Sequence, residues 1–369
     1  MNRAGNWVGG LLMVLAAPVL ALVLSGIIAS VLLLATGYSV GDFWSILLTA
    51  PSERQVVNIL NYGAILYLSG VAAAIGFRMN LFNIGVEGQY RIGAFAGAVF
   101  AGSGWLTGPL NTIVAILIAM VSAALWAGIA GFLRVTRGVS EVISTIMLNA
   151  IAGYLVGYFL RKLGEQSGNA TSTKDVPESS WVGGIDILKG SGQELLGLSL
   201  FAVVVGVLYW LVLNKTVFGF NLRATGGSET AAVASGVDVK RMVVVSMLLS
   251  GAVAGLIGMP VLFGDAHNYG SSFQTGIGFA GIAVALLGRN NPVGIALGAL
   301  IFSYLHEQAN NLNILAGISP DIVQVTQGVI VLCVVVAYEV ARRVRVRIEQ
   351  ASVAAALETR RSERTEVPA

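Results

Sequence analysis

Residues 82–91 read FNIGVEGQYR, and they bring two amides, a carboxylate and two glycines into a region that is otherwise strongly apolar. Asn83 and Glu87 are four residues apart, so a continuous helix would place them on one face. Gly85 and Gly88 would allow a helix to break there, or another part of the backbone to come close. The choice depends on whether this stretch lies in water or at membrane depth.

The composition points to a membrane. Hydrophobic residues make up 56% of the 369 residues and charged residues only 11%, whereas soluble domains carry about 25% charged residues. The mean hydropathy is +0.79. A water-soluble core cannot hide so much apolar surface, so we expect an all-α integral membrane protein. The one cysteine, Cys333, lies in an apolar run and is expected to be a small core hydrophobe.

The apolar runs are the length of membrane helices, which need about 20 residues each. They predict about ten spans, near 8–35, 56–76, 86–106, 110–133, 141–160, 196–213, 242–263, 275–288, 292–309 and 321–341. The eighth is short, which indicates a broken helix buried by other parts of the protein.

The lysines and arginines orient these spans. Most of them fall in the segments that share the side of the N-terminus, which predicts that both termini lie inside the cell. We therefore expect a membrane domain over 1–343, an outer loop over 161–195, and a charged cytoplasmic tail over 344–369.

Two interpretations of residues 82–91 remain open at this level. One is a discontinuous helix beside a translocation path, since polar residues at membrane depth mark a pathway or a partner. The other is a solvated cytoplasmic hairpin flanked by Arg78 and Arg91. A second polar cluster, SEVISTIMLNAI, spans 140–151. The candidate path residues are Asn83, Glu87, Gln89, Glu141 and Asn149.

The second cluster has simpler explanations too. Ser140 is placed to cap the helix that follows, with Glu141 favoured by the helix dipole. For Asn149, a hydrogen bond between helices is favoured over a contact with solute.

Other short patterns are read as structural. GRNNP, at 288–292, predicts a tight inner turn in which Pro292 starts the next helix. The pairs Gly93/Gly97, Gly251/Gly255 and Gly294/Gly298 predict close helix contacts, within the chain or between subunits.

Enzyme and cofactor motifs are missing from the sequence. There is no GxxxxGK[ST] loop for ATP. GIGFAG, at 276–281, fits GxGxxG but follows no strand, and His306-Glu307 lacks the second histidine of a zinc helix because Asn310 stands there. We expect no catalytic site, no metal and no cofactor. The basic residues lie in short loops and the tail, so no nucleic-acid partner is expected.

The polar segment at 218–241, FGFNLRATGGSETAAVASGVDVKR, falls on the inner side. Gly219 and the Gly226-Gly227 pair are expected to break the chain on either side of Arg223. Ser228 then caps a helix of about two turns that ends at Gly236.

The first turn of this short helix contains Glu229, and its apolar surface is made of alanines, including Ala231 and Ala232. A helix that lies on lipid carries larger apolar anchors. Alanines suit close docking against another protein.

This segment resembles the cytoplasmic coupling segment of ABC-importer permeases of the ribose, branched-chain amino acid and nucleoside group. The matching residues are Gly219, Arg223, Ala224, Gly226, Ala231, Ala232, Gly236 and Val237. Ser228 stands where that family commonly has Asn, and both residues cap helices. GFRMNLFNIGVEGQ (76–89), GVSEVISTIMLNAIA (138–152) and GFAGIAVALLGRNNPVGI (278–295) resemble the nucleoside-uptake branch.

The resemblance implies an all-helical fold with an inverted-repeat core in the bacterial cytoplasmic membrane. It implies four partners: an ATPase with two nucleotide-binding halves, a second and different permease, an external substrate-binding lipoprotein, and a small-molecule solute, with purine nucleosides favoured. The coupling segment would be 215–240, with contacts at Gly219, Arg223, Ala224, Gly226, Ser228, Glu229, Ala231, Ala232 and Gly236.

Two alternative functions are kept. One is a simple-sugar permease of the same importer class. The other is an ion-coupled secondary carrier, for which Glu87 and Glu141 would be the intramembrane carboxylates.

Overall fold

The computed structural model describes residues 23–167, 170–270 and 273–334, together with residues 336, 337, 340, 343, 347 and 350. The chain divides into two units, one formed by Met1–Leu47 with Leu312–Ala369 and the other by Leu48–Asn311. The start of the first predicted span and most of the predicted tail lie outside the described residues. The division into 1–343 and 344–369 stays a prediction.

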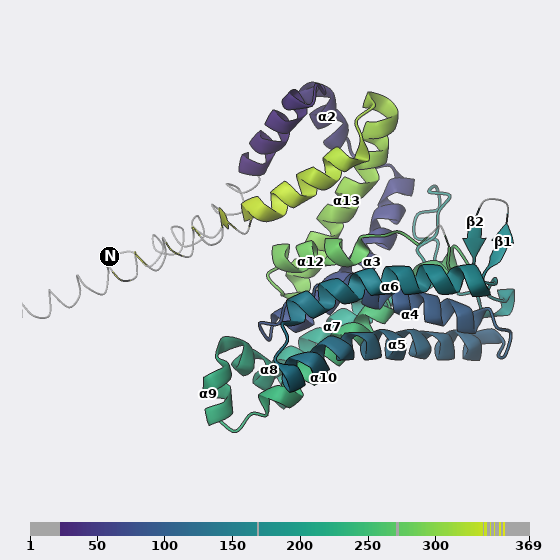
Figure 1. Cartoon of the computed structure of the whole chain (residues 1–369). Coiled ribbons are helices and arrows are strands. Elements are labelled where there is room, and N and C mark those ends of the chain that lie inside the picture. The colour runs from purple at the N-terminus through teal and green to yellow at the C-terminus, as the bar shows by residue number, and fades with distance from the viewer. Residues whose placement is uncertain are drawn as a thin grey trace, which may run out of the picture. The chain divides into compact units, whose positions relative to one another are not determined.

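The larger unit is helical, as the sequence predicts. It contains α3 (Glu53–Phe77), α4 (Val86–Ala101), α5 (Gly108–Arg137), α6 (Glu141–Leu163), α7 (Phe201–Lys215), α8 (Val217–Gly227), α9 (Glu229–Ala234), α10 (Val239–Gly255), α11 (Met259–Gly264), α12 (Ile277–Leu287) and most of α13 (Pro292–Ala316). α5 packs along α4 and α10, and α3 packs along α10 and α12 (Figure 1).

The smaller unit contains a helix over Val23–Ala35, α2 (Val40–Leu47), the end of α13 and a helix over Pro320–Val334. Leu33 and Phe43 are fully buried in it, and the Trp44 indole N–H donates to the Ser30 hydroxyl at 2.9 Å. Cys333 is buried, as expected for a small core residue.

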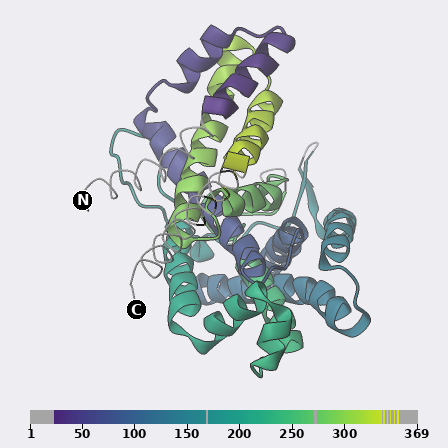
Figure 2. The same ribbon diagram turned by 90° about the vertical axis from the view of Figure 1, so that its left-hand side faces the viewer.

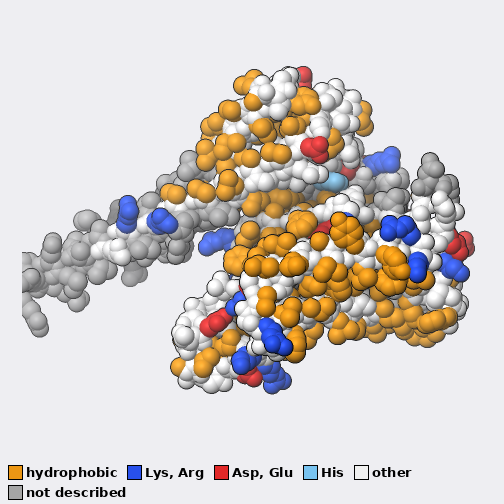
Figure 3. Space-filling model, in the orientation of Figure 1, with side chains coloured by type: hydrophobic (Ala, Val, Ile, Leu, Met, Phe, Trp, Pro, Cys, Tyr) orange, Lys and Arg blue, Asp and Glu red, His pale blue; other side chains and the backbone are white. Residues whose placement is uncertain are grey.

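Several helices meet the length and composition of membrane spans. Among the described residues, five segments do so, namely Glu53–Phe77, Gly108–Arg137, Glu141–Leu163, Gly197–Lys215 and Val239–Gly264, and three shorter apolar helices cover Val23–Ala35, Ile277–Leu287 and Pro320–Val334. α5 and α6 also expose large hydrophobic side chains, visible as a broad apolar surface in Figure 3. The count of ten spans and the inward placement of both termini remain predictions.

Glycines set the close approach of the central helices. A Cβ atom at Gly93 of α4 would lie 2.8 Å from the Ala119 carbonyl oxygen of α5 and 2.9 Å from the Gly255 Cα of α10. Gly97 and Gly251 also face α5. These two predicted small-residue contacts therefore lie within the chain.

The predicted turn at 288–292 is confirmed. Asn290 adopts the left-handed conformation with φ of 55°, and α13 begins at Pro292. The Asn291 side-chain oxygen accepts from the Val293 N–H at 3.0 Å and so caps α13. The Arg78 guanidinium donates to the Asn290 carbonyl at 2.9 and 3.1 Å, which ties this turn to the end of α3.

The segment 161–195, expected to form an outer loop, is partly ordered. β1 (Glu165–Ser167) and β2 (Ala170–Ser172) pair as an antiparallel hairpin, followed by the short helices η1 (Glu178–Ser180) and η2 (Gly197–Leu200). Residues 173–182, here called the outer strap, bind along 263–269. Backbone N–H groups of Thr173, Val176 and Val182 donate to carbonyls of that segment at 2.7–3.0 Å.

One side-chain stack fastens the outer strap. The Trp181 and His267 rings stack with centroids 3.7 Å apart and planes 9° from parallel. Burial lowers the pKa of His267, although the nearby Asp265 and Asp175 carboxylates oppose the shift. Both residues of the stack lie outside the apolar helices.

We expect the outer strap to loosen in acid. Because the pKa of His267 is lower in the folded chain than its unfolded value near 6.5, its stabilising contribution is complete above that value and is lost as the pH falls below it. Thermal unfolding of wild type and His267→Phe at pH 8 and pH 5.5 measures this. The melting temperature of wild type should fall relative to the variant, and a constant difference would contradict the assignment.

Candidate functional site

The helix break predicted at residues 82–91 is present and buried. α3 ends at Phe77 and α4 begins at Val86. Asn83, Glu87 and Gln89 expose only 0, 4 and 1% of their surface. The buried break between α3 and α4 agrees with the discontinuous-helix interpretation, and the solvated hairpin is wrong. The position of the break beside a translocation path stays a prediction. The expectation that a helix would stack Asn83 on Glu87 is also wrong, because Asn83 precedes α4 and faces other partners.

Asn83 sits at the centre of a saturated polar network. Its amide nitrogen donates to the Ser250 hydroxyl at 2.8 Å and to the Gln89 side-chain oxygen at 3.1 Å. Its oxygen accepts from the Gly85 N–H at 3.0 Å and from the Gln89 amide at 2.9 Å. Ser250 in turn donates to the Ala72 carbonyl at 2.6 Å. The network joins the end of α3, the start of α4 and α10.

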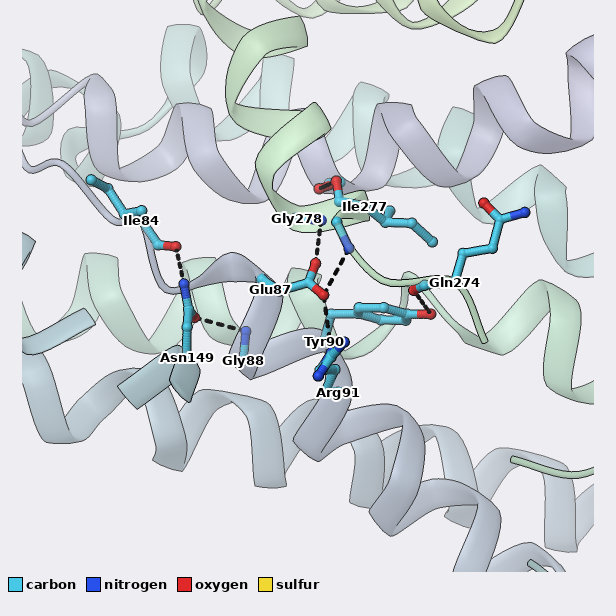
Figure 4. Close-up of polar contacts among 11 residues, drawn as sticks. Ile84, Glu87, Gly88, Tyr90, Arg91, Asn149, Gln274, Ile277 and Gly278 are labelled. Atoms are coloured by element: carbon cyan, nitrogen blue, oxygen red, sulfur yellow. Dashed lines mark hydrogen bonds and ion pairs between the residues drawn. The ribbon is translucent and has the colours of Figure 1, made fainter. Parts of the chain in front are cut away.

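Glu87 joins two helix starts. Its two carboxylate oxygens accept from the N–H groups of Gly276 and Gly278, both at 2.9 Å, at the N-terminus of α12 (Figure 4). Arg91 donates to the same carboxylate at 3.0 Å. A helix N-terminus carries free N–H groups and a partial positive charge, so an anion there satisfies both. Gly278 packs against the Glu87 backbone and leaves no room for a Cβ atom.

Asn149 of α6 holds the start of α4 from the other side. Its side-chain oxygen accepts from the Gly88 N–H, and its amide nitrogen donates to the Ile84 carbonyl, both at 2.8 Å (Figure 4). This confirms the predicted inter-helix hydrogen bond.

Glu141 belongs to an ion-pair chain. It pairs with Arg134 at the end of α5 and accepts from the Phe82 N–H at 3.3 Å. Arg134 also pairs with Glu229 of α9 at 3.2 Å. Ser140 occupies the N-cap position of α6 but its side chain makes no capping bond, so that part of the expectation is wrong.

The short helix predicted within residues 218–241 has the predicted ends. The Ser228 hydroxyl accepts from the Ala231 N–H at 3.3 Å to cap α9, and Gly236 follows the helix with φ of 83°. Figures 1 and 2 place α8 and α9 at one end of the larger unit. Ala232 is buried, whereas Val233 is 60% exposed.

Of the glycines expected to break the chain, Gly219 does not, whereas α8 ends at the Gly226-Gly227 pair before α9. Gly219 and Gly226 lie inside α8, where they face the backbones of Leu213 and Arg78 at distances that exclude a Cβ atom. Arg223, also in α8, donates to the Leu213 carbonyl. These residues pack α8 against α7 and against the loop that opens the helix break. Ala224 lies in the same helix and is half-buried.

Several partners were not singled out from the sequence. No local pattern in the sequence connects Arg134 with Glu141 or Ser250 with Asn83. Gly276 and Gly278 belong to the GIGFAG stretch, which fits GxGxxG without a preceding strand, and their N–H groups bind Glu87. No group of three or more metal-binding side chains occurs in the described part of the chain.

Known proteins are similar to this chain in sequence over most of its length. Residues 55–335 match the family described as branched-chain amino acid transport system / permease component. The guanosine ABC transporter permease protein NupP of Bacillus subtilis is 33% identical over 338 residues, which cover 88% of this chain and 93% of the relative.

Two further relatives extend the comparison. The nucleoside ABC transporter permease protein NupB of Lactococcus lactis is 31% identical, with 87% of this chain and 90% of the relative covered. The glucose ABC transporter permease protein TsgB13 of Haloferax volcanii is 29% identical, with 90 and 89% covered. The chain belongs to the family of branched-chain amino acid transport system permease components, and it is a multi-pass protein of the cytoplasmic membrane.

Proposed function

We propose that this chain is the permease subunit of an ATP-driven importer of nucleosides, with purine nucleosides favoured. Relatives named for guanosine and nucleoside transport align over most of the chain and support this solute. The sequence contains no P-loop, so a separate ATPase with two nucleotide-binding halves supplies the energy. A second, different permease completes the path, and an external lipoprotein delivers the solute.

The observation that carries this proposal is the connection between α9 and the helix break. α9 presents an exposed surface suited to docking, and its Glu229 is joined through Arg134 to Glu141. Glu141 in turn accepts from the Phe82 backbone within the break. α8 packs directly on Arg78, where the break begins. A push by the ATPase on α9 therefore has a short route to the membrane interior.

The helix break is the part that this push would move. Asn83, Gln89 and Asn149 hold the start of α4, while Glu87 holds the start of α12. We assign these residues, with Glu141, to the framework of the translocation path. Because each of these side chains is bound to the break or to the start of α4 or α12, a movement of the break displaces their contacts together.

Two other functions are weighed against this one. A sugar importer is favoured by the relative named for glucose. An ion-coupled carrier needs an intramembrane carboxylate that is free to bind a proton. Glu87 and Glu141 each pair with an arginine, which disfavours that role.

The first test is reconstitution of the native complex. Tagged chain should co-purify with an ATPase and a second permease, and proteoliposomes with the binding lipoprotein should take up guanosine only with ATP. Glucose as the transported solute would favour the sugar importer. Uptake by the isolated chain, driven by an ion gradient, would refute an ATP-driven importer.

The docking role of α9 is tested at Val233. Val233→Glu should abolish ATP-driven uptake while the chain still inserts, because a new charge lies on the exposed face that meets the ATPase. Val233→Ala keeps the surface small and apolar, and should transport normally. Co-purified ATPase and uptake are measured together. Normal uptake by well-expressed Val233→Glu would rule out this contact.

The role of Glu87 in joining the start of α4 to the start of α12 is tested by Glu87→Gln. The amide cannot accept from both glycine N–H groups and leaves Arg91 without its partner, so the free energy of unfolding should fall by about 1–3 kcal/mol and uptake should drop. Glu178→Gln, on the exposed outer surface, is the matched control. Thermal unfolding and uptake rates are measured for both variants. An unchanged unfolding free energy and uptake rate for Glu87→Gln would contradict this role of Glu87.

A further inference from the structure

One polar run in α13 is not used by the contacts described so far. Residues 304–311 read YLHEQANN, in which only Leu305 and Ala309 are apolar. The run falls at the end of the predicted ninth span and in the half of α13 that belongs to the larger unit. Polar side chains at membrane depth are costly and mark a ligand or a partner.

Part of this run has a structural role. Gln308 donates to the Thr49 carbonyl at 3.0 Å, and the Tyr304 hydroxyl donates to the same oxygen at 3.3 Å. Asn311 donates to the Gln308 side-chain oxygen at 2.6 Å. These contacts fix α13 next to the segment that precedes α3, so the remaining polar groups of the run are held in place.

Glu307 is half-buried and is bound differently from the buried carboxylates of Glu87 and Glu141. One of its oxygens accepts from the Asn58 amide of α3 at 3.1 Å. Within the described ranges no cation pairs with it, whereas Glu87 and Glu141 each have an arginine. An ionised carboxylate has about four acceptor positions. Glu307 is half-buried and keeps most of them for another donor.

A ring stack lies beside this carboxylate. His306 and Tyr62 are stacked with centroids 4.2 Å apart, and both are half-buried. Tyr62 and Asn58 are one turn apart on α3, so the rings and the Asn58–Glu307 pair lie on the same seam between α3 and α13.

We propose that this seam is a nucleoside subsite, in which the Glu307 carboxylate accepts from two neighbouring donors of the solute and the Tyr62–His306 stack packs against its ring. The proposal rests on the function proposed above. A purine nucleoside offers such donor pairs at the N1–H and 2-amino group of guanine or at the ribose 2′,3′-diol. Aromatic rings stack on bases with little regard to their identity.

The test compares three solutes in the complete complex. Proteoliposomes containing both permeases, the ATPase and the binding lipoprotein are given saturating guanosine, inosine or 2′,3′-dideoxyguanosine, because saturation removes differences in capture by the lipoprotein. Inosine lacks the 2-amino group, and dideoxyguanosine lacks the diol. Glu307→Gln is nearly isosteric and keeps the oxygen that accepts from Asn58. Glu165→Gln, on the outer hairpin, is the matched control.

Glu307→Gln should lower the saturating rate for guanosine at least about tenfold, the effect of losing roughly 1.4 kcal/mol of binding to the moving solute. If the contacted donors are the diol, dideoxyguanosine should be carried by the variant at its wild-type rate. If they are the base edge, inosine, which keeps N1–H but lacks the 2-amino group, should be slowed clearly less than guanosine.

Other outcomes overturn the subsite. Equal slowing of all three solutes would make Glu307 a packing residue, and no slowing would leave it without a role in transport. A wild-type complex that carries none of the three nucleosides would refute the proposed function itself, and the subsite with it.

Discussion

The Glu87 carboxylate at the start of α12 is the interaction on which the larger unit depends. A helix that begins inside a membrane exposes free N–H groups where no water can satisfy them. Glu87 accepts from two of these groups, on Gly276 and Gly278, and takes its own counter-charge from Arg91. α4 solves the same problem at its own start with Asn83 and Asn149 rather than with a charge. The helix break is stable because each of these N–H groups, which lacks a partner within its own helix, has a side-chain acceptor.

Shared polar contacts also join the helix break to α9. Arg134 pairs with two carboxylates, Glu141 of α6 and Glu229 of α9. An exposed pair such as that with Glu229 contributes little to stability. The pair with Glu141 is largely buried, and breaking it would leave an uncompensated charge. The Glu141 pair therefore reinforces the fold, and the Glu229 pair adds the connection to α9 on which the proposed transmission of movement rests.

Local patterns in the sequence predicted much of this structure. Apolar runs placed the long helices, Ser228 and Gly236 marked the ends of α9, and the buried break at residues 82–91 was one of two stated interpretations. The partners of the buried polar residues were beyond such patterns. Glu87 and Gly276 are 189 residues apart in the chain, and no periodicity connects them. Gly219 is predicted as a chain break because a glycine inside a helix usually weakens it. It lies inside α8 instead, and only the close approach of the Leu213 backbone explains its position.

The carboxylates of Glu87 and Glu307 differ in how many hydrogen-bond donors they contact. That difference is the basis for assigning Glu87 to the structural framework and for proposing Glu307 as a binding residue. A framework carboxylate gains from having every acceptor filled, because unfilled ones carry a desolvation cost. Glu87 meets this condition with two backbone donors and an arginine. Glu307 accepts from one donor, the Asn58 amide, and the stacked rings of Tyr62 and His306 lie on the same seam. If Glu307 served packing alone, an apolar residue would fill the seam at lower cost. A half-satisfied carboxylate there is understandable when a passing solute supplies the missing donors and then leaves, since a complete set of internal partners would compete with it.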